Sequence, residues 1–191
     1  MEDTRIVIFA SGSGTNAENL IRYFQNSSNI HVGLVVTNNP EAGVIKRAET
    51  LGIPVRLIRK KDFANADDVL TLFNQFKINF IVLAGWLLLI PEFLIKRYAN
   101  KIINIHPALL PKFGGKGMYG KYVHQAVVAN NEKESGITIH YVNENYDEGA
   151  IIFQKSVVLD PFDTPEQVAE KVQQLEYEYF PKVIEDLLTS C

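Results

Sequence analysis

Cysteine is almost absent from this sequence of 191 residues, since the only one, Cys191, is the last residue. An intrachain disulfide therefore cannot form, and a metal site built from several cysteines is excluded. Such sparse use of cysteine is typical of proteins kept in a reducing compartment. We accordingly expect neither a disulfide framework nor a bound metal.

An excess of charge of one sign is also lacking. The 19 basic and 22 acidic residues leave a net charge of −3, and no stripe of the sequence interleaves basic with aromatic residues. Binding to the phosphate backbone of nucleic acids requires clustered positive charge. We therefore expect no nucleic-acid partner.

Long hydrophobic runs are missing as well. The longest, INFIVLAGWLLLI at residues 78–90, is interrupted by Gly85 and falls short of the roughly 20 residues that a membrane-spanning helix needs. The N-terminal segment MEDTRIVIFASG carries acidic residues where a signal peptide carries basic ones. These features predict a soluble protein of the cytoplasm with no membrane partner.

The sequence does contain a regular alternation of two kinds of segment. Short and almost continuously apolar segments, typical of strands buried on both faces, occur at residues 5–10, 31–38, 55–58, 80–85 and 101–106. Helical patterns occur at residues 16–25, 42–51, 66–76 and 122–129. This order predicts a doubly wound, mostly parallel α/β sheet with crossovers on both faces.

The pattern changes after Gly136. Segments 136–142 and 151–159 alternate in polarity, which indicates two antiparallel strands joined by a tight polar turn. A long C-terminal helix follows, opened by Thr164 and the Pro-Glu-Gln after it. Because no segment has the composition of a linker, we predict a single domain over residues 1–191, with these strands as an antiparallel C-terminal extension.

A glycine-rich turn follows the first strand. In FASGSGTNAENL, the two glycines and Ala17 fit the G-x-G-x-x-A pattern of a dinucleotide site. That site also needs an acidic residue at the end of the second strand, where residues 37–40 are Thr-Asn-Asn-Pro, so NAD is not expected. The turn after Gly14, with Thr15 and Asn16, instead suits a single phosphate group at a helix N-terminus. A ligand-free turn capped by Ser or Thr is the alternative.

Two polar residues end the fifth predicted strand. In INIHPALLPKF, Asn104 and His106 stand two apart and share one face, at the carboxyl end where open α/β sheets place ligands. An amide that stabilises an oxyanion beside an imidazole that moves a proton is equipment for acyl transfer. Asp147, in the later turn NYDEGAII, supplies a carboxylate that would raise the pKa of His106. The alternatives are a structural histidine and a simple Asp-x-Gly hairpin turn.

Five motifs that span nearly the whole chain resemble the folate-dependent formyltransferases: SGSGTN, AGWLLLIP, NIHPALLPKF, GITIHYV and DEGAII. Within that family the likeness is to the glycinamide ribonucleotide (GAR) formyltransferases of purine biosynthesis. The resemblance implies a Rossmann-like fold and transfer of a formyl group from the cosubstrate 10-formyltetrahydrofolate to the glycinamide amine. No nucleophilic Ser or Cys elbow is present, which favours direct transfer. The implied partners are small molecules, and a homodimer is possible.

The resemblance also implies roles for individual residues. Asn104 would be the oxyanion donor, His106 the general acid, and Asp147 the residue that keeps His106 charged. The residues implied to bind the ribonucleotide are Gly14, Thr15, Asn16, Ala17 and Glu176. Those implied to bind the folate are Asn104 and, mainly through backbone hydrogen bonds, Leu87, Leu88, Leu89 and Ile90.

Some regions and other activities stay open at this stage. The loop 114–121 is either a mobile flap or an ordered surface loop, and residues 59–61, Arg-Lys-Lys, offer only charge for the glutamate tail of the folate. His140 precedes Asp147 and is a further candidate for the site. Alternative functions are hydrolysis of formyltetrahydrofolate, another folate-dependent formyl transfer such as that to methionyl-tRNA, and nucleotide binding without catalysis.

Overall fold

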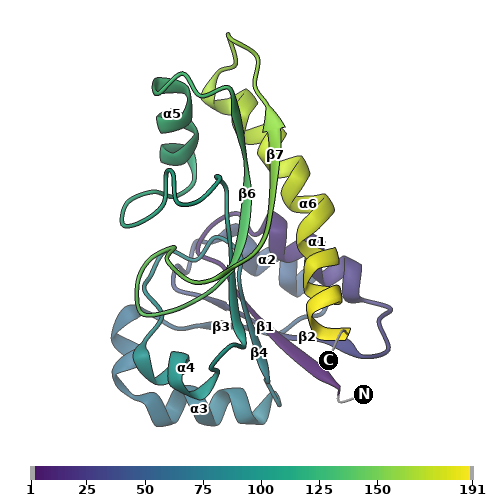
Figure 1. Ribbon diagram of the computed structural model, residues 1–191. Coiled ribbons are helices and arrows are strands. Elements are labelled where there is room, and N and C mark those ends of the chain that lie inside the picture. Colours follow the sequence, from purple (N-terminus) through teal and green to yellow (C-terminus); the bar gives the residue numbers. More distant parts are fainter. Residues whose placement is uncertain (1–2, 190–191) are drawn as a thin grey trace.

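The computed structural model describes residues 3–189, and a seven-stranded sheet forms its centre (Figure 1). The strands lie in the order β3-β2-β1-β4-β5-β6-β7. Their bounds are β1 Thr4–Phe9, β2 Ile30–Thr37, β3 Val55–Leu57, β4 Phe80–Leu83, β5 Ile102–His106, β6 Glu134–Tyr141 and β7 Ile151–Val158. Strands β1 to β5 are parallel, while β6 and β7 pair antiparallel. The predicted α/β class with an antiparallel extension is confirmed.

The central strands are buried on both faces, which explains their almost continuous apolar sequence. In β1, Ile6 and Ile8 pack into one hydrophobic cluster, whereas Val7 and Phe9 pack into the other. Successive side chains of a strand point to opposite faces, so one strand contributes to two cores. All four residues of β4 are buried.

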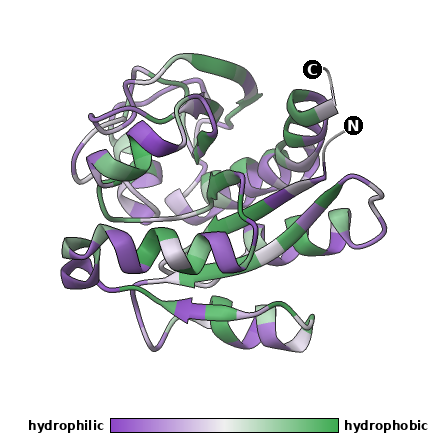
Figure 2. Ribbon diagram, turned by 90° about the horizontal axis from the view of Figure 1, so that it is seen from below, coloured by the Kyte–Doolittle hydropathy of each residue, from purple (hydrophilic) through white to green (hydrophobic). Residues whose placement is uncertain are grey.

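Helices cover both faces of the sheet (Figure 1). The first cluster receives buried side chains from α1 (Thr15–Phe24), α2 (Gly43–Thr50) and α6 (Pro165–Thr189). The second receives them from α3 (Ala66–Gln75) and α4 (Glu92–Arg97). In Figure 2 these helices alternate between hydrophobic and hydrophilic positions along their length, as amphipathic helices do. None of the helices within residues 3–189 is apolar over a length that could cross a membrane.

Two parts of the structure differ from or extend the sequence prediction, and a third agrees with it. The β6–β7 connection is not a tight turn, because it runs over residues 142–150. Helix α4 and a 3₁₀ helix at Lys60–Ala64 are too short for their period to be visible in the sequence. The start of α6 is confirmed: the N–H of Thr164 donates to Oε1 of Gln167 at 2.8 Å, and the N–H of Gln167 donates to Oγ1 of Thr164 at 3.3 Å, a reciprocal capping box.

The direction of winding reverses at β1, and this reversal positions the functional site. Strands β2 and β3 are added on one side of β1, and β4 and β5 on the other. Such a switch point opens a crevice at the carboxyl ends of the central strands. The loops that follow β1 and β4 are joined there, because the N–H of Ser11 donates to the carbonyl of Gly85 at 2.9 Å.

Candidate active site

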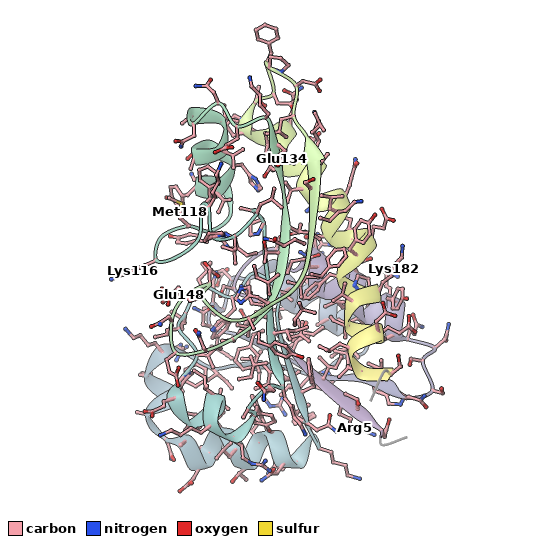
Figure 3. All side chains as sticks on the ribbon, viewed as in Figure 1. Arg5, Lys116, Met118, Glu134, Glu148 and Lys182 are labelled. Carbon is pink, nitrogen blue, oxygen red and sulfur yellow. The ribbon has the colours of Figure 1, made fainter. Side chains whose placement is uncertain are left out.

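A cavity of about 710 Å³ lies at the carboxyl ends of β1, β4 and β5. Its wall is contributed by segments far apart in the sequence: residues 12–16, 84–87, 104–107 and 115–120, together with His124, Tyr146, Asp147, Ala169, Val172, Gln173 and Glu176. In Figure 3 the loop with Lys116 and Met118 lies on the same side of the sheet as the loop with Glu148. The predicted glycine-rich turn and the predicted Asn104–His106 pair therefore meet in one cavity.

Asp147 lies between the two polar residues of β5. Its Oδ1 is 3.4 Å from Nδ2 of Asn104, and its Oδ2 is 3.5 Å from Nδ1 of His106. The main-chain N–H of Gly115 donates to Oδ2 at 2.9 Å. Asp147 has a left-handed backbone, with φ 58°, a conformation that aspartate adopts more readily than most residues. The long β6–β7 connection thus brings the predicted third residue to Asn104 and His106.

The carboxyl group of Asp147 is ionised in this setting. Burial alone would raise its pKa, but the hydrogen bond with His140, the charge of His106 and the N–H of Gly115 outweigh burial and hold the pKa below its usual value. The carboxylate is therefore available as a fixed negative charge beside His106.

Each ring nitrogen of His106 faces an oxygen that can accept a hydrogen bond. Its Nε2 lies 2.7 Å from the main-chain carbonyl of Phe113, and its Nδ1 faces Asp147. The side chain is 4% exposed. Burial lowers the pKa of His106 below its usual value, and His140 lowers it further, whereas Asp147 and the Phe113 carbonyl act in the opposite direction without offsetting burial.

These opposing effects bear on the role predicted for Asp147. Asp147 does raise the pKa of His106, as the sequence predicts, but burial has the larger effect. Burial and Asp147 therefore act on the pKa of His106 in opposite directions, and burial has the greater influence. A buried neutral imidazole is equipped to accept a proton before it donates one.

His140 is a neighbour of Asn104 that the sequence only suggests. The two residues face each other in the β5–β6 register, and Nε2 of His140 lies 3.1 Å from Nδ2 of Asn104. The other ring nitrogen, Nδ1, lies 2.8 Å from the carbonyl of Tyr141. Because a carbonyl only accepts, Nδ1 carries a proton, while Nε2 faces both the Asn104 amide and, at 3.5 Å, Oδ1 of Asp147. The amide of Asn104 is thereby fixed with its second N–H toward Asp147.

The glycine-rich turn leads into α1 without a side-chain cap among the described residues. Gly14 is the N-cap residue and has φ 77°, which a residue with a Cβ adopts rarely. A Cβ at Gly14 would also collide with Val44, at the start of α2, whose N–H donates to the carbonyl of Gly12 at 3.2 Å. The alternative of a turn capped by Ser or Thr is therefore not what the structure contains, and the first-turn N–H groups of α1 remain for an anion.

Side chains of α6 close the cavity beside this turn. Nδ2 of Asn16 donates to Oε2 of Glu176 at 2.8 Å, and Nε2 of Gln173 donates to Oγ1 of Thr15 at 3.4 Å. Burial raises the pKa of Glu176 to about 7, although the hydrogen bond from Asn16 lowers it. Thr15, Asn16 and Glu176 thus lie together at this end of the cavity.

Several predicted binding residues do not present their side chains to the cavity. Ala17 is fully buried in the first hydrophobic cluster, so only its main-chain N–H is available to a ligand. Leu87 lines the cavity, but Leu88 packs against the second cluster and Ile90 is buried in it. Leu89 is 45% exposed outside the cavity wall. Of the predicted folate contacts, the structure brings Leu87 and Asn104 to the cavity.

Unpaired buried polar atoms gather around the cavity. Within residues 3–189, five buried side-chain polar atoms lack a hydrogen-bond partner. Three of them, Oδ1 of Asn16, Nε1 of Trp86 and Nδ1 of His124, belong to residues that line the cavity, whereas those of Asn38 and Ser135 do not. Buried polar atoms in native proteins are normally paired, which favours a cavity built for a polar ligand. No group of three His, Cys, Asp or Glu residues suited to a metal ion occurs in this part of the chain, while Cys191 lies outside it.

Comparison with known proteins relates this site to one family. The model of the family described as formyl transferase matches residues 4–184. The phosphoribosylglycinamide formyltransferase of Bacillus subtilis (strain 168) is 36% identical over 189 residues, which cover 96% of this chain and 94% of that protein. A chloroplastic phosphoribosylglycinamide formyltransferase of Vigna unguiculata is 41% identical over 96% of this chain, but the chain spans 60% of that protein. The crystal structure of phosphoribosylglycinamide formyltransferase from Bacillus halodurans superposes with a TM-score of 0.87, at 36% identity, covering 97% of this chain and 96% of that one.

Proposed function

Because the chain belongs to the formyl transferase family, we propose that it transfers the formyl group of 10-formyltetrahydrofolate to the amine of glycinamide ribonucleotide, which is phosphoribosylglycinamide. The observation that carries this proposal is the shared wall of one cavity: the phosphate-binding turn after β1 and the group formed by Asn104, His106 and Asp147 line it together. A single substrate can therefore reach both. The cytoplasmic location and the homodimer stay predictions.

The acceptor substrate is oriented by the turn after β1. Its phosphate is held at the N-terminus of α1 by main-chain N–H groups of Gly14, Thr15, Asn16 and Ala17, where the helix dipole favours an anion. In the present pairing the Asn16 amide donates to Glu176 and its Oδ1 is free to accept. Asn16 and Glu176 therefore suit a ribose hydroxyl better than a phosphate oxygen.

The transfer proceeds by addition and elimination at the formyl carbon. The amine nitrogen forms a bond to this carbon, and the π electrons of the carbonyl move to its oxygen. The N–H of Asn104 that makes only the long 3.4 Å contact with Asp147 in the free protein stabilises this oxyanion. The proton released by the amine passes to Nδ1 of neutral His106. The imidazolium, stabilised by Asp147, then returns the proton to the folate nitrogen N10 as the carbon–N10 bond breaks.

Hydrolysis of the formyl folate is the second candidate, with water in place of the amine. The phosphate-binding turn favours transfer, because a hydrolase has no use for a phosphate site beside its catalytic group. The two are separated by following tetrahydrofolate release from 10-formyltetrahydrofolate with and without GAR. We expect slow release without GAR and stoichiometric formyl-GAR with it. Equal rates in both reactions would replace the transferase proposal with the hydrolase.

A further inference from the structure

The two ring nitrogens of His106 compete for one proton whenever the ring is neutral. Nδ1 faces a carboxylate oxygen of Asp147 at 3.5 Å, and a negative acceptor favours an N–H on that side. Nε2 faces the carbonyl of Phe113 at 2.7 Å. Hydrogen bonds between nitrogen and oxygen are formed at about 2.7–3.2 Å, so only the contact with Phe113 has the length of a formed bond.

The Phe113 carbonyl reaches His106 because the backbone at Phe113 is left-handed, with φ 56°. A bulky residue in this region is a genuine outlier that the surroundings must maintain. The surroundings are visible here: the side chain of Phe113 packs against the first hydrophobic cluster. A Cβ at the following Gly114 would lie 3.3 Å from Cβ of Asp147. Two residues on, the N–H of Gly115 donates to Asp147.

We infer that Phe113 is a positioning residue: its main-chain carbonyl, delivered by the left-handed backbone, keeps the proton of neutral His106 on Nε2 and leaves the lone pair of Nδ1 facing Asp147 and the cavity. Without this carbonyl, the neutral ring places its proton on Nδ1, toward the carboxylate. Nδ1 then has no lone pair with which to accept the proton of the amine. The catalytic consequence rests on the proposed function, whereas the tautomer does not.

The tautomer is measured first, on the unmodified protein without substrates. Long-range ¹H–¹⁵N spectra of ¹⁵N-histidine-labelled protein at about pH 8, where histidines are neutral, report which nitrogen carries the proton. The His106 signals are assigned by their loss in His106→Gln. We expect the Nε2–H form for His106 and the Nδ1–H form for His140. A predominant Nδ1–H form of His106 would overturn the inference without any variant of Phe113.

Two isomeric substitutions then test the backbone of Phe113. Ile and Leu have the same atoms, but the β-branched Ile resists a positive φ more strongly than Leu. We expect Phe113→Ile to raise the share of the Nδ1–H form and to lower kcat by about tenfold or more, with the KM for GAR little changed. Phe113→Leu should keep the Nε2–H form and exceed the Ile variant in kcat. Identical tautomers in the two variants would contradict the inference.

Lys77 supplies a matched control for the loss of stability caused by a β-branched residue at a positive φ. It has φ 55°, is exposed and does not line the cavity, so Lys77→Ile should lower the melting temperature without changing kcat. The readouts also separate this inference from the proposed function. If no formyl transfer occurs but Phe113→Ile shifts the tautomer as expected, the proposed function fails and the positioning role of Phe113 stands.

Discussion

The main-chain N–H of Gly115 and the carboxylate of Asp147 form a hydrogen bond of 2.9 Å that joins two loops across the cavity. A main-chain donor is not removed by a side-chain substitution and does not titrate. The group at position 147 therefore keeps its orientation when its charge is removed, because an asparagine oxygen accepts the same hydrogen bond. Asparagine also tolerates the left-handed backbone at this position.

Asp147→Asn should consequently change the electrostatics of His106 more than its geometry. The carboxylate raises the pKa of His106, so its removal lowers that pKa. Because the proposed reaction starts from neutral His106, the acid limb of the profile of kcat/KM against pH should move to lower pH. The plateau should fall by about a hundredfold, since the imidazolium intermediate loses its counter-charge.

The control for this prediction compares His106→Asn with the double variant His106→Asn, Asp147→Asn. If Asp147 acts through His106, adding the second substitution to the first should have little further effect on kcat. If the fold-losses in kcat of the two single variants multiply in the double variant, Asp147 acts independently of His106. An earlier loss of activity on the alkaline side in Asp147→Asn would mean that charged His106 starts the reaction.

Asn104→Ala should lower kcat by roughly 10²–10³-fold, the usual effect of removing one oxyanion donor. GAR should still bind, because the substitution leaves the proposed phosphate site, the turn after β1, unchanged. The measurement is steady-state kinetics for both substrates, with Asn74→Ala, an exposed position of α3, as the matched control. A KM effect without a kcat effect would place Asn104 in substrate binding only.

Gly12→Val should raise the KM for GAR while the KM for the folate changes little. A Cβ at Gly12 meets no atom within 4 Å, so the variant should fold, yet Gly12 lines the cavity and a larger side chain blocks the approach of the phosphate to the N–H groups. Gly12→Ala should have a smaller effect of the same kind. An unchanged KM for GAR in folded Gly12→Val would remove this turn from the substrate site.

Glu176→Gln should make the protein's stability less dependent on pH. Burial raises the pKa of Glu176 to about 7 in the folded protein, so the folded state favours the protonated form. The stability that this group contributes is fully present below the ordinary glutamate pKa and is lost as the pH rises through about 7. Urea unfolding of both proteins should show wild type losing about 1–3 kcal/mol relative to Glu176→Gln between pH 4.5 and 8. A difference in unfolding free energy between the two proteins that stays the same from pH 4.5 to 8 would contradict this prediction.

Much of the fold and of the proposed catalytic group follows from local patterns. Strands buried on both faces have continuous apolar segments, and polar residues at the end of such a strand lie at the ligand-binding edge of the sheet. For this reason Asn104 and His106 are predictable, and Asp147 can be proposed as their partner. The order of helices and strands likewise predicts the crossovers on both faces.

The remaining features depend on main-chain atoms and on packing, which residue identity does not encode. The carbonyl of Phe113 and the N–H of Gly115 are main-chain groups. Almost every residue has both, so the sequence does not single these two out. The approach of His140 to Asn104 depends on the β5–β6 register. Burial of Ala17 and Ile90, and the balance between burial and charge at His106, depend on how completely the neighbouring elements pack.

The hydrogen bond between Asn16 and Glu176 joins positions 160 residues apart. During synthesis, the turn after β1 leaves the ribosome well before α6, which carries Glu176. A nascent chain therefore completes this end of the cavity only after α6 has been translated and has docked, so the proposed acceptor site cannot form on the first half of the sheet alone.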